Sequence, residues 1–168
     1  GLLGPHEFLG YLESLNLTHH LSNAALIQCA ELAKQLNIQK LLENNFRFSV
    51  NISTLEFYEP DFTQRIEQTI KATGVPLGIF ELEITEGIAL HDLQLAKHKM
   101  LELEHFGLTL SLDDFGTGYS SLSYLKNLDV SKLKIDKSFI DGIEQDIQDQ
   151  KLVDSIIKIA QNFDLMVV

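Results

Sequence analysis

Four short segments of this chain each end in a polar side chain of a kind that binds metal ions or phosphates. They end at Asn51, at Glu83, at the pair Asp113 and Asp114, and at Lys134. Within each segment apolar and polar residues alternate, and the side chains of a strand alternate between its two faces. Asn51, Glu83, Asp113 and Lys134 therefore fall on the polar face of four predicted strands, a pattern typical of a site at one edge of a sheet.

The residue types at these positions indicate the chemistry. Hard oxygen ligands are offered by Asn51, Glu83, Asp113 and Asp114. Such ligands suit Mg²⁺, Mn²⁺ or Ca²⁺ better than zinc or copper. Asp113 and Asp114 would point to opposite sides of an extended strand, but both can reach a two-ion cluster where the backbone turns. Lys134 is suited to orient a water or to neutralise a phosphate oxygen. This combination predicts metal-assisted phosphodiester hydrolysis; the alternative for each single carboxylate is a solvated side chain or a helix cap.

Helical periodicity fills the segments between the strands. Ser22 is predicted to cap a helix that begins at Asn23, and Gly74 and Gly107 are suited to follow the ends of two later helices. The predicted helices are 23–36, 60–73, 92–106, 120–127 and 148–163, and the last strand is 165–168. Strands and helices that alternate in this way imply a parallel sheet with right-handed crossovers.

The polar face of the strands distinguishes between architectures. Strands of an open parallel sheet that is covered on both sides are apolar on both faces. A half-exposed antiparallel sheet would alternate, but it would not need the intervening helices. A TIM-like (β/α) barrel fits, because its working residues lie at the C-terminal ends of the strands. We predict an α/β fold, a barrel fragment with about five parallel strands.

Composition limits the class of partner. The chain has 168 residues, with 13 Lys and Arg against 24 Asp and Glu, and a net charge of −11. This charge argues against a nucleic acid polymer, but it allows a small phosphorylated ligand if metal ions lie between the ligand and the carboxylates. No apolar run approaches the ~20 residues of a membrane span, and no secretory signal is visible.

The cysteine and histidine residues carry little functional signal. We interpret the single cysteine, Cys29, as a small buried helix residue. His91, His98 and His105 recur every seven residues, about 10 Å apart along a helix, so a packing or surface stripe is favoured over a metal site. With a single cysteine the chain has no internal disulfide, and its composition therefore gives no indication of a compartment other than the cytoplasm.

A glycine-containing loop, 115–121, follows the two aspartates. Gly116 and Gly118 permit unusual backbone angles. Two such glycines alone favour the simpler interpretation of an ordinary turn between strand and helix. Next to Asp113 and Asp114, the loop becomes a candidate for adjusting the geometry of metal ligands.

Four ordered motifs resemble those of the EAL domain, the family of bacterial cyclic-di-GMP phosphodiesterases. The motifs are VNIS at 50–53, ELEITE at 81–86, LDDFGTGYSSL at 112–122 and LKIDKSF at 133–139. The opening GPHEF, residues 4–8, is similar to the segment that follows the first strand of the family. The resemblance covers essentially the whole chain.

The resemblance implies a β/α barrel that opens cyclic-di-GMP to linear pGpG with two Mg²⁺ or Mn²⁺ ions. It implies catalytic roles for Lys134, Asp114 and Glu86, of which Glu86 would hold the loop at 115–121. It also implies a cytoplasmic signalling protein that forms a homodimer and carries a sensor or GGDEF-type domain. The alternatives are a non-catalytic cyclic-di-GMP receptor and a regulatory dimerisation module on the same barrel. The implied metal ligands are Asn51, Glu83, Asp113 and Asp114.

The family pattern also has parts that this chain does not contain. The name-giving Glu-Ala-Leu strand is expected before Gly1, and a glutamate and a glutamine of the site are expected after Val168. Residues 1–168 are therefore expected to form a partial EAL domain that lacks its first strand and its last strands. We expect the parent domain to be a hydrolase and this piece alone to be inactive.

Overall fold

The computed structural model describes residues 4–117, 125–126 and 128–168. In this part of the chain five parallel strands form one sheet, and their order in the sheet is their order in the sequence. They are β1 (Phe48–Ile52), β2 (Phe80–Thr85), β3 (Thr109–Phe115), β4 (Lys132–Ile135) and β5 (Met166–Val167). The sheet is open, with β1 and β5 as its two edges. The predicted fold class and the five parallel strands are confirmed.

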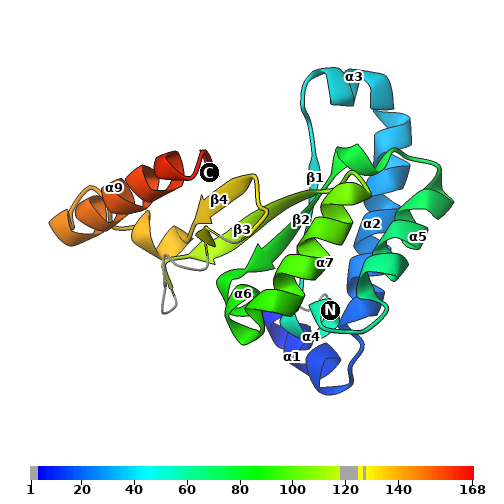
Figure 1. Ribbon diagram of the computed structural model, residues 1–168, viewed down its shortest axis with the longest axis horizontal. Helices are drawn as coiled ribbons and strands as arrows, with labels where there is room; N and C mark the ends of the chain where they lie inside the picture. Colours follow the sequence, from blue (N-terminus) through cyan, green and yellow to red (C-terminus); the bar gives the residue numbers. More distant parts are fainter. Residues whose placement is uncertain (1–3, 118–124, 127) are drawn as a thin grey trace.

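Helices connect the strands, as the periodicity predicted. In Figure 1, α2, α5 and α7 lie together beside β1–β3, while α9 lies beside β4 and β5. None of the described helices is long and apolar enough to cross a membrane. The helices are α1 (Pro5–Ser14), α2 (Thr18–Gln35), α3 (Ile38–Glu43), α4 (Thr54–Phe57), α5 (Phe62–Thr73), α6 (Glu86–His91), α7 (Leu93–His105) and α9 (Ile147–Asn162), with short 3-10 turns η1 (Leu77–Ile79) and η2 (Lys137–Phe139).

The side chains on the apolar face of the strands form the core. Val50 of β1 and Leu82 of β2 are buried in one cluster with Ile66 of α5 and Met100 of α7. Burial of each such side chain stabilises the fold by about 1.5–3 kcal/mol. The alternate side chains of each strand point to the other face of the sheet, and this face carries the candidate site.

Helix boundaries show where local signals were sufficient. Gly74 and Gly107 follow α5 and α7 with φ angles of 73° and 93°, which suits residues without a Cβ. Asp92 caps α7 by accepting a hydrogen bond of 3.0 Å from the backbone N–H of Leu95. The end of α5 and both ends of α7 agree with the sequence prediction to within one residue.

Three predicted boundaries were wrong, and one prediction falls outside the described residues. The helix predicted from Asn23 begins at Thr18, so Ser22 lies inside α2 rather than at its cap. The reason is a tertiary contact, because the Ser22 hydroxyl donates to the Glu56 carboxylate. Likewise α5 begins at Phe62, two residues later than predicted, and β1 begins at Phe48, whereas the alternation of apolar and polar residues predicts a strand from Phe46. The helix predicted over 120–127 lies mostly outside the described part of the chain.

Cys29 lies on α2, partly buried against the core. Burial raises the pKa of its thiol, which disfavours the reactive thiolate. This environment agrees with the predicted role as a small helix residue.

Candidate active site

The predicted site residues of the first three strands lie at one edge of the sheet, because parallel strands end on the same side. Asn51 and Glu83 are direct register partners on β1 and β2. Glu83 in turn pairs with Ser111 on β3, and Asp113 is level with Thr85. Asp113 therefore reaches one same-face step farther along the sheet than Asn51 and Glu83.

A β-bulge places the two aspartates. Between two aligned pairs, β3 has one residue more than β4, so Asp113 and Asp114 together lie opposite Lys134. Asp114 has a φ of 54°, in the left-handed region that Asp tolerates better than most residues. Because a bulge interrupts the alternation of side chains, the two carboxylates need not point to opposite faces. The aligned pairs are Leu112 with Leu133 and Phe115 with Ile135.

Lys134 links the strand ends. Its Nζ lies 2.8 Å from Oε2 of Glu83 and 3.1 Å from Oδ2 of Asp113. Burial opposes the charge, but the hydrogen bonds to Glu83 and Asp113 outweigh it and raise the pKa of Lys134. The lysine is thus a fixed positive charge between two of the predicted metal ligands.

Asp114 has a more acidic environment. Partial burial, then the charges of Asp113 and Asp136, raise the pKa of its carboxyl. The pKa of Asp136 is lowered, because the hydroxyl and the backbone N–H of Ser138 donate to it. Asp136 is therefore a further candidate residue of the site, and the sequence prediction did not include it. The polar parity of β4 continues two residues past Lys134 and could have indicated it.

Glu86 begins α6 directly after β2, and only 3% of its surface is exposed. Neither of its carboxylate oxygens has a hydrogen-bond partner among the residues that the structure describes. A buried carboxylate without a partner is costly. Most of the predicted contact segment, 118–121, lies outside the described residues, so the loop-holding role of Glu86 stays a prediction.

Gly116, the first glycine of that loop, is favoured by its backbone conformation and by close packing. Its φ is 100°, and a Cβ at this position would lie 3.0 Å from Cε2 of Phe139 and 3.2 Å from Cδ1 of Ile156. The backbone therefore turns directly after the bulge, against η2 and α9. Gly118 lies outside the described residues.

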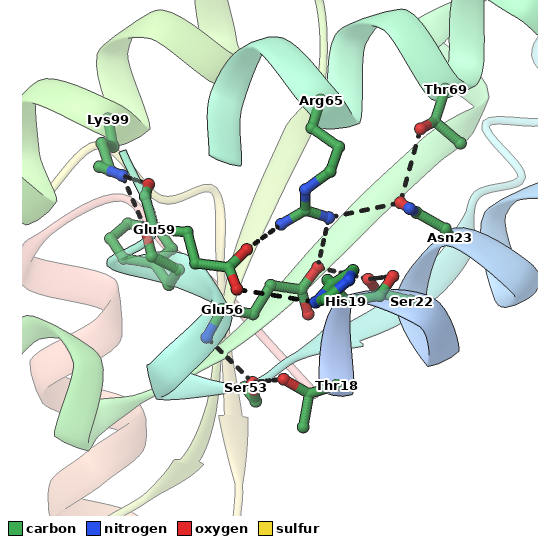
Figure 2. A network of polar contacts seen from close by, with 11 residues as sticks. Thr18, His19, Ser22, Asn23, Ser53, Glu56, Glu59, Arg65, Thr69 and Lys99 are labelled. Carbon is green, nitrogen blue, oxygen red and sulfur yellow. Dashed lines mark hydrogen bonds and ion pairs between the residues drawn. The ribbon is translucent and has the colours of Figure 1, made fainter. Parts of the chain in front are cut away.

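A polar network fixes the segment that follows Asn51 (Figure 2). Ser53 caps α4 by accepting a 3.2 Å hydrogen bond from the backbone N–H of Glu56, and its hydroxyl donates to Thr18 at 3.0 Å. The Glu56 side chain, 1% exposed, accepts from Ser22 and forms an ion pair of 3.1 Å with Nη1 of Arg65. The end of β1 is thus joined to α2 and α5.

The same network continues to α7. Nη2 of Arg65 lies 2.7 Å from Oε2 of Glu59, and the buried Lys99 ammonium donates to the carbonyl oxygens of Phe57 (2.9 Å) and Glu59 (2.5 Å). Burial lowers the pKa of Lys99, although nearby carboxylates oppose this shift. These contacts give Arg65 and Lys99 structural roles on the helical side of the sheet.

Tyr58 connects this network with the helix that carries Glu86. Its hydroxyl donates to the carbonyl oxygen of Ile88 at 2.5 Å and accepts from the backbone N–H of Asp92 at 3.1 Å. The connections after β1 and β2 are therefore held against each other, which fixes the relative positions of Asn51 and Glu86.

The histidines of the predicted stripe make separate contacts. The ring of His91 lies 4.7 Å from that of Tyr58, and His98 is exposed, 3.3 Å from Glu102. His105 contacts the carbonyl oxygen of Leu101. These are packing and surface contacts, in agreement with the sequence prediction.

The donor set at the strand ends fits hard divalent cations in chemistry. In the described part of the chain, no three His, Cys, Asp or Glu side chains are grouped closely enough to hold an ion by themselves. Glu83 and Asp113 converge on Lys134, and Asp113 and Asp136 raise the pKa of Asp114. Carboxylates crowded together in this way, with an amide from Asn51 on the next strand, are suited to share Mg²⁺ or Mn²⁺.

Comparisons with known proteins point to one family. The family model of the EAL domain matches residues 1–168. The signaling protein YkoW of Bacillus subtilis is 33% identical over 164 residues, 98% of this chain and 20% of the relative. The cyclic di-GMP phosphodiesterase NbdA of Pseudomonas aeruginosa is 31% identical over 168 residues, 100% of this chain and 21% of the relative. The chain thus spans about a fifth of the length of these relatives.

A solved structure extends the similarity to three dimensions. The phosphodiesterase MucR of Pseudomonas aeruginosa, in a complex with c-di-GMP, superposes with a TM-score of 0.90 and 30% identity. The match covers 99% of this chain and 67% of that chain.

Proposed function

Because the chain belongs to the EAL domain family, we propose that it is part of a metal-dependent phosphodiesterase that opens cyclic-di-GMP to linear pGpG. The observation that carries the proposal is the position of the Lys134 ammonium, 2.8 Å from Glu83 and 3.1 Å from Asp113 at the C-terminal edge of the sheet. A relative that covers the whole chain is named a cyclic di-GMP phosphodiesterase.

Each site residue has a role in this proposal. Bound Mg²⁺ or Mn²⁺ would supply Lewis acidity toward the phosphodiester and lower the pKa of a bound water. Glu83 and Asp113 would hold the cations, with the positive Lys134 beside them to neutralise a phosphate oxygen. The remaining ligands would be Asn51 and Asp114.

The surroundings of Asp114 favour the protonated form of its carboxyl group. The pKa of Asp114 is raised by burial and by its two acidic neighbours, so without a cation this carboxyl holds a proton more readily than an ordinary aspartate.

The rest of the protein is also part of the proposal. The relative MucR is named a bifunctional diguanylate cyclase/cyclic di-GMP phosphodiesterase. We infer a fusion to a GGDEF-type or sensor domain, a homodimer and a cytoplasmic site of action. Cyclic-di-GMP is then the ligand, and the strongly acidic chain does not bind a nucleic acid polymer.

The second candidate function is a cyclic-di-GMP receptor without turnover. It would need a degraded site, whereas Asn51, Glu83, Asp113, Asp114 and Lys134 are all present here. This observation favours the enzyme.

The test is to incubate the purified full-length protein with cyclic-di-GMP and Mg²⁺ or Mn²⁺, and to separate the products by liquid chromatography. We expect linear pGpG, and we expect Lys134→Met to reduce turnover by about a hundredfold, the scale of losing one charge-stabilising group. Lys158→Met, which removes an exposed lysine of α9, is the matched control. Binding of cyclic-di-GMP without pGpG would support the receptor instead.

We also propose that residues 1–168 form a partial domain. The outer edge of β1 borders a hollow of 510 Å³ that is lined by both faces of β1, by Phe8 of α1 and by Leu21 and Ala25 of α2. A strand paired with this edge would fill the hollow. An isolated 168-residue chain should therefore lack turnover and should associate through its free strand edges. Its mass in solution and an assay with Mn²⁺ test this; a monomer as active as the full-length protein would contradict it.

A further inference from the structure

A second ion pair lies on the same face of the sheet as Lys134. The Lys132 ammonium contacts the Glu81 carboxylate, and Lys134 contacts Glu83. Both lysines belong to β4 and both glutamates to β2, so each pair crosses over β3. Glu81 and Lys132 thus form a lower pair, one same-face step before the pair that belongs to the candidate site.

The register of the strands shows where two glutamates of β2 lie relative to Lys132. Lys132 is level with Ser111, and Ser111 is level with Glu83. Glu81 lies one same-face step lower, level with Thr109. Lys132 therefore leans back to Glu81 although the site carboxylate of Glu83 is at its own level.

The carboxylate of the lower pair is shielded from water, and its lysine is partly exposed. The Glu81 side chain is 3% exposed and that of Lys132 is 24% exposed. Between β2 and β4 lies the fully buried Ser111, whose hydroxyl has no hydrogen-bond partner among the described residues. Charges in such surroundings are screened less than charges on the surface, so the partner of Lys132 matters for the site.

We propose that Glu81 is a positioning residue, which holds Lys132 away from Glu83 and so keeps that carboxylate available to Lys134 and a divalent cation. This inference rests on the proposed function, because it assigns the pair to the same cation site. Without Glu81, the freed Lys132 would bind Glu83, to which it is already level, and would compete with the cation. Neither residue needs to touch the cation for this effect.

The expected size follows from the spacing. One same-face step along a strand is about 6.6 Å. Redirecting a unit charge over this distance in a partly buried site changes the affinity for a divalent cation by about tenfold.

The experiment measures Mn²⁺ binding to the full-length protein without substrate, by electron paramagnetic resonance of the free ion. Glu81→Gln, which keeps the shape of the side chain, should weaken Mn²⁺ binding by about tenfold. Glu81→Gln combined with Lys132→Met should restore the affinity to within about twofold of the wild type, because no lysine is left to compete. Lys158→Met is the matched control and should leave the affinity unchanged.

A merely structural role for the ion pair gives a different result. Loss of the second partner would then leave the double variant at least as impaired as Glu81→Gln, and this outcome overturns the inference. Unchanged Mn²⁺ affinity in Glu81→Gln overturns it as well, even if the double variant does not fold. Absence of Mn²⁺ binding by the wild type would instead reject the proposed function. Asp113→Asn in the same assay separates this failure from failure of the inference about Glu81. If Asp113→Asn weakens Mn²⁺ binding and Glu81→Gln does not, the cation site stands and only the inference is rejected.

Discussion

In the part of the chain that the structure describes, two clusters of acidic side chains differ in how their charge is balanced. On the helical side, Glu56 and Glu59 share the guanidinium of Arg65, and Ser22 also donates to Glu56. At the strand ends, Lys134 is the one cation that contacts a carboxylate of the predicted ligand set among the described residues. In the first cluster one guanidinium and a hydroxyl serve two carboxylates, whereas in the second one ammonium serves Glu83 and Asp113 and does not pair with Asp114.

This difference separates a structural role from a functional one. A buried ion pair that is fully hydrogen-bonded fixes neighbouring elements, and the removal of one partner is costly. A site with perturbed pKa values and excess acidic groups is suited to bind an external cation. Residue type alone does not make the distinction, since both clusters are built from carboxylates.

The largest expected effect is on the second cluster. Asp113→Asn in the full-length protein should reduce turnover of cyclic-di-GMP by about a thousandfold or more, because it removes a charge that the site needs to hold cations. Steady-state assays with Mg²⁺ measure this. Activity within tenfold of the wild type would reject Asp113 as a principal ligand.

The next effect is on the first cluster. Arg65→Met should leave Glu56 and Glu59 without their cation and lower the local free energy of unfolding by about 3–5 kcal/mol. Hydrogen-exchange mass spectrometry on peptides from α4 and α5 of the full-length protein measures this loss.

Lys158→Met is the matched control for Arg65→Met. It breaks an exposed pair with Asp154 and should cost below about 0.5 kcal/mol. Equal effects of the two substitutions would show that the buried network does not stabilise this region.

A smaller effect is expected at Glu86. Glu86→Ala should lower turnover by about 10- to 100-fold, while the affinity for cyclic-di-GMP changes little, because this residue is proposed to hold a loop rather than to touch the substrate. Titration calorimetry in Ca²⁺, beside turnover in Mg²⁺, separates the two quantities. Equal losses in both would contradict the loop-holding role.

The smallest effect concerns Lys99 and pH. Its pKa is lowered from 10.5 in the folded state, so the unfolded chain binds more protons between the lowered value and 10.5, and stability rises with pH in this window. The stability advantage of the wild type over Lys99→Met should therefore grow as the pH rises through the alkaline range toward 10.5. Chemical denaturation of the full-length protein at neutral and alkaline pH measures it, and an advantage that shrinks would reject the lowered pKa.

Much of the fold could be predicted from the sequence because a local alternation of apolar and polar residues identifies the strands. The alternation along β1 and β2 predicted both the sheet and the shared edge of Asn51 and Glu83, which are register partners in the structure. Strong periodicity of this kind depends on few distant contacts.

What the sequence did not reveal depends on tertiary structure. Ser22 looks like a helix cap, but its hydroxyl is used by Glu56, which is distant in sequence. The bulge that carries Asp114 arises from the mismatch of two strands. Asp136 continues the polar face of β4, but its effect on the pKa of Asp114 depends on the proximity of the two residues in the folded chain. Local propensity cannot predict these contacts.

The left-handed backbone of Asp114 has a consequence for how variants at this position are interpreted. With a φ of 54°, the position admits Asp, Asn or Gly far more easily than a β-branched residue. Asn would therefore remove the charge and keep the bend, whereas Val would disturb both and could straighten the strand. In a survey of natural variants, a chain with Asn here has lost one carboxylate, but a chain with Val has lost the shape of the strand end, and with it the placement of Asp113.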